Sequence, residues 1–317
     1  MEDVCHGLDF VVPVCNNNLV IRVTLESIIV NYKPINIYIV TNERDMVILE
    51  KECLQWNVYN TKINFIDEEK YFIDYYGLTK SDIYQWYTWK DELSREYGWW
   101  YQQLIKLGAY KQIKNLSDPY VVWDSDLIVL QKWNLYDKDE NIHKFAILQE
   151  CAKNEFNKNE YSKSINELIG FPSIEPPIEG TFVPHHFIMH HKILDSLVNH
   201  IENRSEEKNI WIKKTMLLSN SYYRFSEYKC IATYMNVYYP ELLSFYPFHE
   251  YGKNGIRYRE SNEIIDILIK FLKNQSYNDI RKIELTYDTF QNFIQETFND
   301  IPSYIQLEHV ICQPLEN

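Results

Sequence analysis

The segment Tyr120–Trp123 is followed by two carboxylates, Asp124 and Asp126, with the small residue Ser125 between them. The four residues before them are apolar or aromatic, which is typical of a strand buried on both faces. Charges so close to a core are costly unless they face a cleft or bind a cation. Carboxylates at this spacing suit Mg²⁺ or Mn²⁺, and a metal so held keeps positions open for substrate phosphates. We therefore predict a metal site at which Asp124, Ser125 and Asp126 meet a diphosphate.

A D-x-D tripeptide can also be an ordinary solvated turn. Asp137 and Asp139 have the same spacing, but they lie in a polar segment with no strand before them. We expect that second pair to be a solvated loop. The buried strand in front of Asp124 distinguishes the two cases.

The elements that position these carboxylates belong to an α/β pattern. Apolar runs at 8–14, 35–41 and 62–68 predict strands, and helices are expected between them at 18–32 and 43–54. Strands that alternate with helices in this way imply right-handed crossovers and a parallel sheet with helices on both sides. Such a sheet binds its ligands at the carboxyl ends of the strands.

The remainder of the chain adds elements to this domain. Periodicity predicts a helix at 98–113, directly before the D-x-D strand, and further strands at 143–150 and 180–191. The pattern after these strands is mostly helical. We expect an α/β domain over residues 1–255, with a C-terminal helical extension over residues 256–317 packed on it.

Composition excludes several classes of protein. The chain has 317 residues, of which 45% are hydrophobic, so it can bury a full core. The formal net charge of −13, without a Lys/Arg-rich run, argues against nucleic acid as the main partner. No apolar run approaches the ~20 residues needed to span a bilayer, and the N-terminus is acidic where a signal peptide would be basic. The six cysteines show no paired spacing, and we expect reduced thiols in a cytoplasmic protein.

The segment YVVWDSDLIVL (120–130) resembles the D-x-D strand end of glycosyltransferases with the GT-A fold. More narrowly, four segments in order resemble the DUF6492 group of bacterial and viral proteins predicted to be glycosyltransferases: GWWYQQLIKL (98–107), DSD (124–126), FVPHHFIMHHKIL (182–194) and FSEY (225–228). This resemblance covers about residues 8–250. If the chain comes from a virus, we expect the protein in the cytoplasm of the host cell. The resemblance implies a Rossmann-like GT-A sheet that is mostly parallel, a hexosyl- or pentosyltransferase activity, and Mn²⁺ or Mg²⁺ as cofactor. It also implies a donor of the UDP- or GDP-sugar type and a hydroxyl acceptor on a glycan or other small molecule.

The resemblance assigns donor-binding roles to residues at the strand ends. Asp124 and Asp126 match the metal and diphosphate carboxylates, with Asp126 the expected direct ligand and Asp124 the expected contact to the donor sugar or ribose. Further donor contacts are expected at the ends of the first three strands and on the preceding helix, at Val12, Pro13, Val14, Thr41, Asn42, Asp67, Gln102 and Lys106. Asp67 could equally cap a helix at its strand end. Gln102 and Lys106 are one turn apart and share a helix face.

Three histidines are candidates for the site. We expect His185 and His186 to border the acceptor pocket, with a purely structural role as the alternative. His186 and His190 share a strand face, but a zinc site is rejected because no third ligand follows at a characteristic spacing. The segment FHEYGKNG (248–255) resembles a degenerate H-x-x-G-x-x-K-P element of glycogenin-like transferases. In that element His249 would complete the metal shell and Lys253 would meet the diphosphate, although Lys253 stands two places early.

Glu227 is the candidate catalytic base. Ser226 is placed to cap a helix whose first turn contains Glu227. The resemblance places this carboxylate at the cleft, where it would take the proton from the acceptor hydroxyl in an inverting reaction. The simpler interpretation is that Glu227 only complements the helix dipole.

Other functions compete with an inverting transferase. A retaining glycogenin-like transferase, a sugar nucleotidylyltransferase and a non-catalytic carbohydrate-binding protein are the alternatives. The loop after the first strand, VCNNNL (14–19), has no glycine with which to cradle a triphosphate, which argues against the nucleotidylyltransferase.

Overall fold

The computed structural model describes residues 7–56, 58–89, 94–137, 142–146, 155–176, 182–204, 210–219, 224–246, 255–258, 262–274 and 285–308. The strands are β1 (Phe10–Pro13), β2 (Asn36–Thr41), β3 (Lys62–Asp67), β4 (Tyr120–Trp123), β5 (Leu127–Val129), β6 (Tyr136–Asp137), β7 (Ile142–Ala146), β8 (His186–Met189), β9 (Leu243–Tyr246), β10 (Ile256–Tyr258) and β11 (Tyr304–Leu307).

The helices are α1 (Ile21–Tyr32), α2 (Glu43–Cys53), α3 (Ile73–Tyr76), α4 (Lys80–Tyr84), α5 (Ser94–Gln112), α6 (Glu155–Ile169), α7 (His191–Asn203), α8 (Trp211–Leu217), α9 (Glu227–Tyr238), α11 (Asn262–Asn274) and α12 (Tyr287–Thr297). The described residues also include the 3₁₀ turns η1 (Glu68–Lys70) and η3 (Pro240–Leu242).

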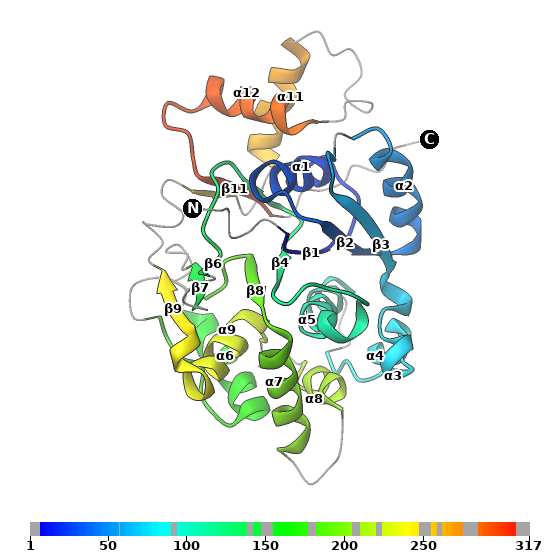
Figure 1. The fold of residues 1–317 in the computed structure, drawn as a ribbon, viewed down its shortest axis with the longest axis vertical. Helices are drawn as coiled ribbons and strands as arrows, with labels where there is room; N and C mark the ends of the chain where they lie inside the picture. Colours follow the sequence, from blue (N-terminus) through cyan, green and yellow to red (C-terminus); the bar gives the residue numbers. More distant parts are fainter. Residues whose placement is uncertain are drawn as a thin grey trace.

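The central sheet has five strands in the order β3-β2-β1-β4-β8. The first four are parallel, and β8 runs antiparallel to β4. Helix α1 covers one face of this sheet and α5 covers the other (Figure 1). The predicted α/β class, with a mostly parallel sheet flanked by helices, is confirmed.

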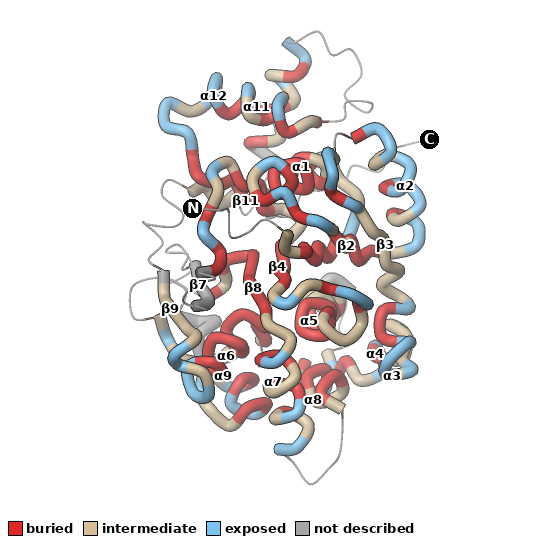
Figure 2. Tube along the Cα trace, in the orientation of Figure 1, coloured by how far each residue is buried: buried red, intermediate tan, exposed pale blue. Residues whose placement is uncertain are grey.

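Successive side chains of a strand point to opposite faces of the sheet, and both faces of this sheet are covered, so the strands are continuous apolar runs in the sequence. In β1, Val11 packs in the cluster on the α5 side, whereas Phe10 and Val12 pack in the cluster on the α1 side. Both faces are covered, so every position must be apolar. Strands β4 and β8 are buried along their length in the same way (Figure 2). The carboxylates after β4 therefore begin where the covered part of the sheet ends.

A second, three-stranded sheet brings distant residues to the end of β4. Strand β11 lies between β10, to which it is parallel, and β5, to which it is antiparallel. The backbone N–H of Leu307 donates to the carbonyl of Asp126 at 3.0 Å. Gly255, directly before β10, lies against the Tyr304 ring of β11, because a Cβ there would lie 2.0 Å from that ring. A third sheet has the order β6-β7-β9.

The segment expected as a helical extension also contains strands. Helices α11 and α12 pack over α1 (Figure 1), and their buried residues Leu268 and Phe290 share a cluster with Val20 and Val23. Strands β10 and β11 belong to the same segment, and β11 joins it to β5. The division at residue 255 stays a prediction.

One strand differs from its expected range. The strand expected at 180–191 is only β8, because the backbone at His185 has a φ of 61°, outside the extended region, and because His191 already begins α7. Strand β7 (Ile142–Ala146) confirms the described part of the strand expected at 143–150, and residues 147–150 lie outside the described part. Helix α5 begins at Ser94, one turn before the expected start.

Within the ranges that the structure describes, no helix combines the length and the apolar character needed to cross a bilayer.

Packing of the C-terminal helices predicts that they unfold together with the main sheet. The Phe290 side chain is fully buried, so Phe290→Ala should lower the free energy of unfolding of the whole chain by about 3–5 kcal/mol. The matched control is Ile267→Ala on α11, because Ile267 is 46% exposed. Urea denaturation followed by tryptophan fluorescence measures both. A separate minor transition that alone responds to Phe290→Ala would contradict this prediction.

Candidate active site

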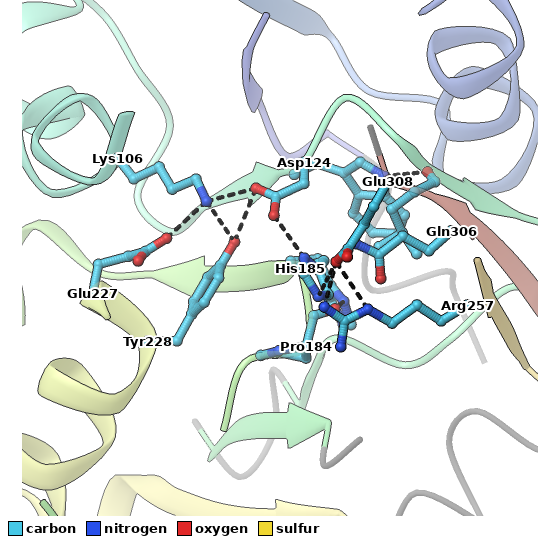
Figure 3. A network of polar contacts seen from close by, with 12 residues as sticks. Lys106, Asp124, Pro184, His185, Glu227, Tyr228, Arg257, Gln306 and Glu308 are labelled. Atoms are coloured by element: carbon cyan, nitrogen blue, oxygen red, sulfur yellow. Dashed lines mark hydrogen bonds and ion pairs between the residues drawn. The ribbon is translucent and has the colours of Figure 1, made fainter. Parts of the chain in front are cut away.

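The antiparallel pairing of β8 with β4 creates the centre of the candidate site. Trp123 pairs with His186, so the residues just outside this pair, Asp124 and His185, are adjacent. The Asp124 backbone N–H donates to the His185 carbonyl at 2.8 Å. The side chains also meet, with His185 Nδ1 at 2.9 Å from Asp124 Oδ2 (Figure 3). One carboxylate oxygen of Asp124 is thus directed at a histidine.

The other oxygen of Asp124 meets a buried lysine from α5. Lys106 Nζ lies 2.6 Å from Asp124 Oδ1 and 2.7 Å from Glu227 Oε1. It also lies 3.2 Å from the Tyr228 hydroxyl and over the Tyr228 ring, 4.7 Å from its centroid (Figure 3). Lys106 and Glu227 are each 3% exposed. One ammonium group therefore joins α5, the end of β4 and the start of α9.

The charges of Lys106, Asp124 and Glu227 shift one another's pKa values. Burial acts to lower the pKa of Lys106, but the carboxylates of Asp124 and Glu227 outweigh burial and hold that pKa well above its usual value. Burial acts to raise the pKa of Asp124, and Lys106 and His185 instead hold it well below its usual range. For Glu227 burial dominates and raises the pKa, although Lys106 opposes it. Asp124 is therefore the firmly ionised carboxylate, and Glu227 is the one closer to accepting a proton.

Asp126 has a different environment from Asp124. Burial, followed by the charge of Asp124, raises the pKa of Asp126 to about 7. Its Oδ1 atom is buried and has no hydrogen-bond partner among the described residues. A buried carboxylate oxygen without a donor is costly unless a cation or another ligand meets it.

Three side chains in this region could hold a divalent metal. Asp124, Asp126 and His185 each offer a ligand atom, and these atoms lie within 4.8 Å of one another. The unpartnered oxygen of Asp126 is the observation that fits a bound cation best. Two carboxylates suit Mg²⁺ or Mn²⁺, and an imidazole nitrogen shifts the preference away from Mg²⁺.

Six of the residues predicted to bind the donor lie at the ends of β1, β2 and β3, which are on the side of β4 away from β8. Asn42 caps α2 by accepting from the Asp45 N–H at 2.9 Å. Asp67 caps η1 by accepting from the Glu69 N–H at 3.0 Å, so the cap considered as its alternative role is present. Val12, Pro13, Val14 and Thr41 are buried at the ends of β1 and β2.

A pocket opens at the ends of β2 and β3. Its volume is about 390 Å³, and its lining includes Asn42, Asp67, Lys70, Lys80 and Tyr97. The Lys80 ammonium group is paired with Glu68 at 2.6 Å in this lining. Asn42 and Asp67 are the two predicted nucleotide contacts that border the pocket.

The remaining predicted residues have varied positions. Gln102 is half-buried one turn before Lys106, and its neighbour Gln103 accepts from the Glu227 N–H at 3.1 Å. His186 is 2% exposed and packs against two tryptophan rings, which lowers its pKa to about 3 through burial. Its neutral ring lies in the core beneath the site. His249 and Lys253 lie outside the described residues.

Sequence reasoning missed two residues at the site. Glu308 follows β11, and its Oε1 lies 3.9 Å from His185 Nε2. Arg257, in β10, donates from Nε to the same Glu308 oxygen at 2.8 Å (Figure 3). A signal was present, because Glu308 directly follows the short buried strand β11, just as Asp124 follows β4.

The buried ion pairs predict a large effect of Lys106 on stability. Lys106→Met should lower the free energy of unfolding by about 3–5 kcal/mol, because it leaves the Asp124 and Glu227 carboxylates buried without their cation. Lys114→Met is the matched control, since the Lys114 side chain is 87% exposed and its ion pair with Asp74 is long, at 3.8 Å. Urea denaturation measures both variants. Similar small losses in the two variants would show that the buried cation is not needed for folding.

Several solved structures are similar to this chain at low sequence identity. Mouse xyloside xylosyltransferase 1 is 12% identical, with 76% of this chain and 85% of that chain covered and a TM-score of 0.43. The 4-diphosphocytidyl-2C-methyl-D-erythritol synthase of Anaerococcus prevotii is 8% identical, with 77% and 88% covered and a TM-score of 0.35. Core-mannan synthase A of Aspergillus fumigatus, in its Mn/GDP form, is 12% identical, with 78% and 73% covered and a TM-score of 0.39.

A search of curated proteins finds no match. The family model of DUF6492, described as a family of unknown function, matches residues 13–250. This match spans most of the α/β domain, including the D-x-D strand and the start of α9. The chain therefore belongs to the DUF6492 family.

Proposed function

We propose that the protein is a metal-dependent glycosyltransferase. It would move a sugar from a UDP- or GDP-type donor to a hydroxyl group on a glycan or other small acceptor. The observation that carries the proposal is the end of β4, where Asp126 has a buried oxygen that no described residue partners and Asp124 is paired with a buried lysine. A solvated turn would need neither feature. The resemblance of segment 120–130 to the D-x-D strand end of GT-A glycosyltransferases supports the same function.

Asp124 and Asp126 would hold the metal and the donor diphosphate. A bound divalent cation supplies Lewis-acid stabilisation of the leaving diphosphate. Asp126 is the better direct ligand because its Oδ1 oxygen is the one without a partner in the described part of the chain. Asp124 is fixed by Lys106 and His185, which suits a residue that orients the donor sugar or ribose.

Lys106 would have two tasks in this site. It keeps the Asp124 and Glu227 carboxylates at 2.6 and 2.7 Å from one ammonium group, so they hold a constant spacing despite their like charges. Its fixed positive charge also lies beside the carboxylates that would meet the donor. A pre-positioned cation of this kind stabilises negative charge that develops on the leaving group.

Glu227 would be the general base of an inverting reaction. It would take the proton of the acceptor hydroxyl as that oxygen attacks the anomeric carbon and the bond from this carbon to the diphosphate breaks. Burial raises the pKa of Glu227, and a base with a pKa nearer to the working pH is more effective. Its side chain is 4% exposed, so the acceptor would enter a nearly closed space that excludes water.

The pocket at the ends of β2 and β3 would accept the nucleoside. Asn42 and Asp67 line it, and Thr41 ends the same strand β2. With Val12, Pro13 and Val14 at the end of β1, these residues form a row that leads toward Asp124. A base and ribose in the pocket would thus extend their phosphates toward the D-x-D motif.

Nucleotidylyl transfer is less compatible with the loop after β1. In that function the loop would present its backbone N–H groups to a triphosphate. Here the Asn17 N–H donates to the Asp45 carboxylate at 3.0 Å, and the Val20 N–H donates to the Asn18 side chain at 3.0 Å. The first contact places an anion where a phosphate would have to bind.

Asp126→Asn tests the metal role. The variant should lose at least tenfold in Mn²⁺ affinity and the Mn²⁺-dependent part of its affinity for UDP or GDP, because the neutral amide lacks the negative charge of the carboxylate. Asp137→Asn, from the second D-x-D, is the matched control and should change neither value. Calorimetric titration with Mn²⁺ and with nucleoside diphosphates measures both. Equal losses in the two variants, or donor turnover that persists in EDTA, would contradict the assignment.

Glu227→Gln tests the base role. Transfer should slow by roughly 10²–10⁴ with donor affinity unchanged, because the amide cannot accept the proton. The rate is measured in single turnovers, and urea denaturation reports whether the lost Lys106 pair weakens the fold. NMR of the anomeric proton of the product should show an inverted configuration. A retained configuration, or a normal single-turnover rate in the variant, would remove Glu227 from this role.

A further inference from the structure

The His185 ring lies between two carboxylates. Its Nδ1 atom is 2.9 Å from Asp124 Oδ2, and its Nε2 atom is 3.9 Å from Glu308 Oε1 (Figure 3). The residue is only 9% exposed. Among the described residues, Nε2 has no hydrogen-bond partner at normal distance. The ring thus has an acidic group near each nitrogen, and the contact between Nε2 and Glu308 is longer than a hydrogen bond.

A neutral imidazole has a single N–H and can donate to only one of these carboxylates. The other nitrogen then directs its lone pair at a negative charge. A cation beside Nδ1 resolves this conflict, because Nδ1 and Asp124 can both bind it. The unpartnered Oδ1 of Asp126 belongs to the same group, whose ligand atoms lie within 4.8 Å of one another. One divalent cation would therefore satisfy three groups together.

Several contacts hold the Glu308 carboxylate near the second nitrogen of the His185 ring. Arg257 donates to its Oε1 from Nε at 2.8 Å and also contacts that oxygen through Nη2. The Gln306 side-chain amide is 3.4 Å from the same oxygen. The Glu308 backbone N–H donates to the Tyr258 carbonyl at 3.0 Å. These contacts fix the carboxylate from both β10 and β11.

The backbone at His185 also directs the ring. Its φ of 61° lies in the left-handed region, which residues with a side chain seldom adopt. Such a conformation persists when the surroundings determine it, and it is concentrated at functional sites. Here the carbonyl of His185 accepts from the Asp124 N–H at 2.8 Å, which holds the ring next to the D-x-D motif.

We propose that His185 is the nitrogen ligand of the metal through Nδ1, and that Glu308 is a positioning residue that accepts a hydrogen bond from Nε2–H. The ring keeps one proton, which resides on Nε2 when Nδ1 binds the cation. Metal-binding histidines commonly donate their other N–H to a carboxylate in this way. The inference rests on the proposed metal site, and it gives His185 a role other than bordering the acceptor. Glu308 lies outside residues 13–250, which match the family.

Pulsed electron paramagnetic resonance of bound Mn²⁺ tests His185. The parent protein is prepared with unlabelled and with ¹⁵N-labelled histidine. If a histidine nitrogen binds Mn²⁺, the modulation of the Mn²⁺ echo by that nitrogen nucleus should change with the label. His185→Asn should remove this histidine signal. His190→Asn is the matched control, because His190 follows the other end of β8 and also has its Nδ1 near an aspartate, Asp118, at 3.2 Å. That control should keep the signal.

Mn²⁺ affinity tests Glu308. Replacing Glu308 and Arg257 together by Met removes the acceptor without leaving the arginine unpaired, and should weaken Mn²⁺ binding by about 10–100-fold. It should weaken Mg²⁺ binding less, because imidazole is a poorer ligand for Mg²⁺. Glu308→Gln breaks the same ion pair but keeps an oxygen that can accept from Nε2–H, so it should lose less Mn²⁺ affinity than the double variant. Equal Mn²⁺ losses in both variants would show that the pair only ties β10 to β11, and would overturn the role of Glu308.

The outcomes separate this inference from the proposed function. If the parent binds Mn²⁺ but shows no histidine coupling, the role of His185 is refuted and the D-x-D site stands. If His249→Asn removes the coupling and His185→Asn does not, His249 is the ligand instead. If the parent binds neither Mn²⁺ nor Mg²⁺, the metal site and the metal-dependent function both fail.

Discussion

The ammonium group of Lys106 is the interaction on which the candidate active site depends. It is buried and contacts Asp124, Glu227 and the Tyr228 hydroxyl, which come from the end of β4 and the start of α9. Two carboxylates at this depth would repel each other and resist ionisation without a cation between them. Helix α5 supplies this cation from beneath the sheet. The spacing of the acidic groups is thus determined by a residue that reaches the site through the core.

The direction of β8 determines what else can reach Asp124. Because β8 is antiparallel to β4, the residue before its first pair lies beside the residue after the last position of β4. Strand β11 does the same through β5 and brings Glu308 near His185. Three strand ends therefore meet at one point, and each contributes an ionisable side chain. The pocket of about 390 Å³ lies at the parallel ends of β2 and β3 instead.

Local patterns predicted part of this arrangement. Asp124 and Asp126 were predictable because a buried strand directly precedes them, and Lys106 because it lies on a face of the preceding helix. The partnership of Lys106 with Glu227 was not, since the two are 121 positions apart and no local pattern encodes that contact. Glu308 was missed because its segment was assigned to a helical extension. Near-continuous apolar runs predicted the parallel strands well, whereas the order of the strands and the small sheet β10-β11-β5 depend on long-range pairing.

The small sheet also has a consequence for how the protein matures. Its pairing of β5 with β11 joins residues 127–129 to residues 304–307, so this part of the fold has a very high contact order. Long-range pairings of this kind form late, because the closure of a long loop must precede them. The main sheet can therefore assemble while Glu308 and Arg257 are still absent from the site. A chain caught at that stage would already have the pocket at the ends of β2 and β3 but an incomplete set of charges around His185, so the two parts of the candidate site would form at different times.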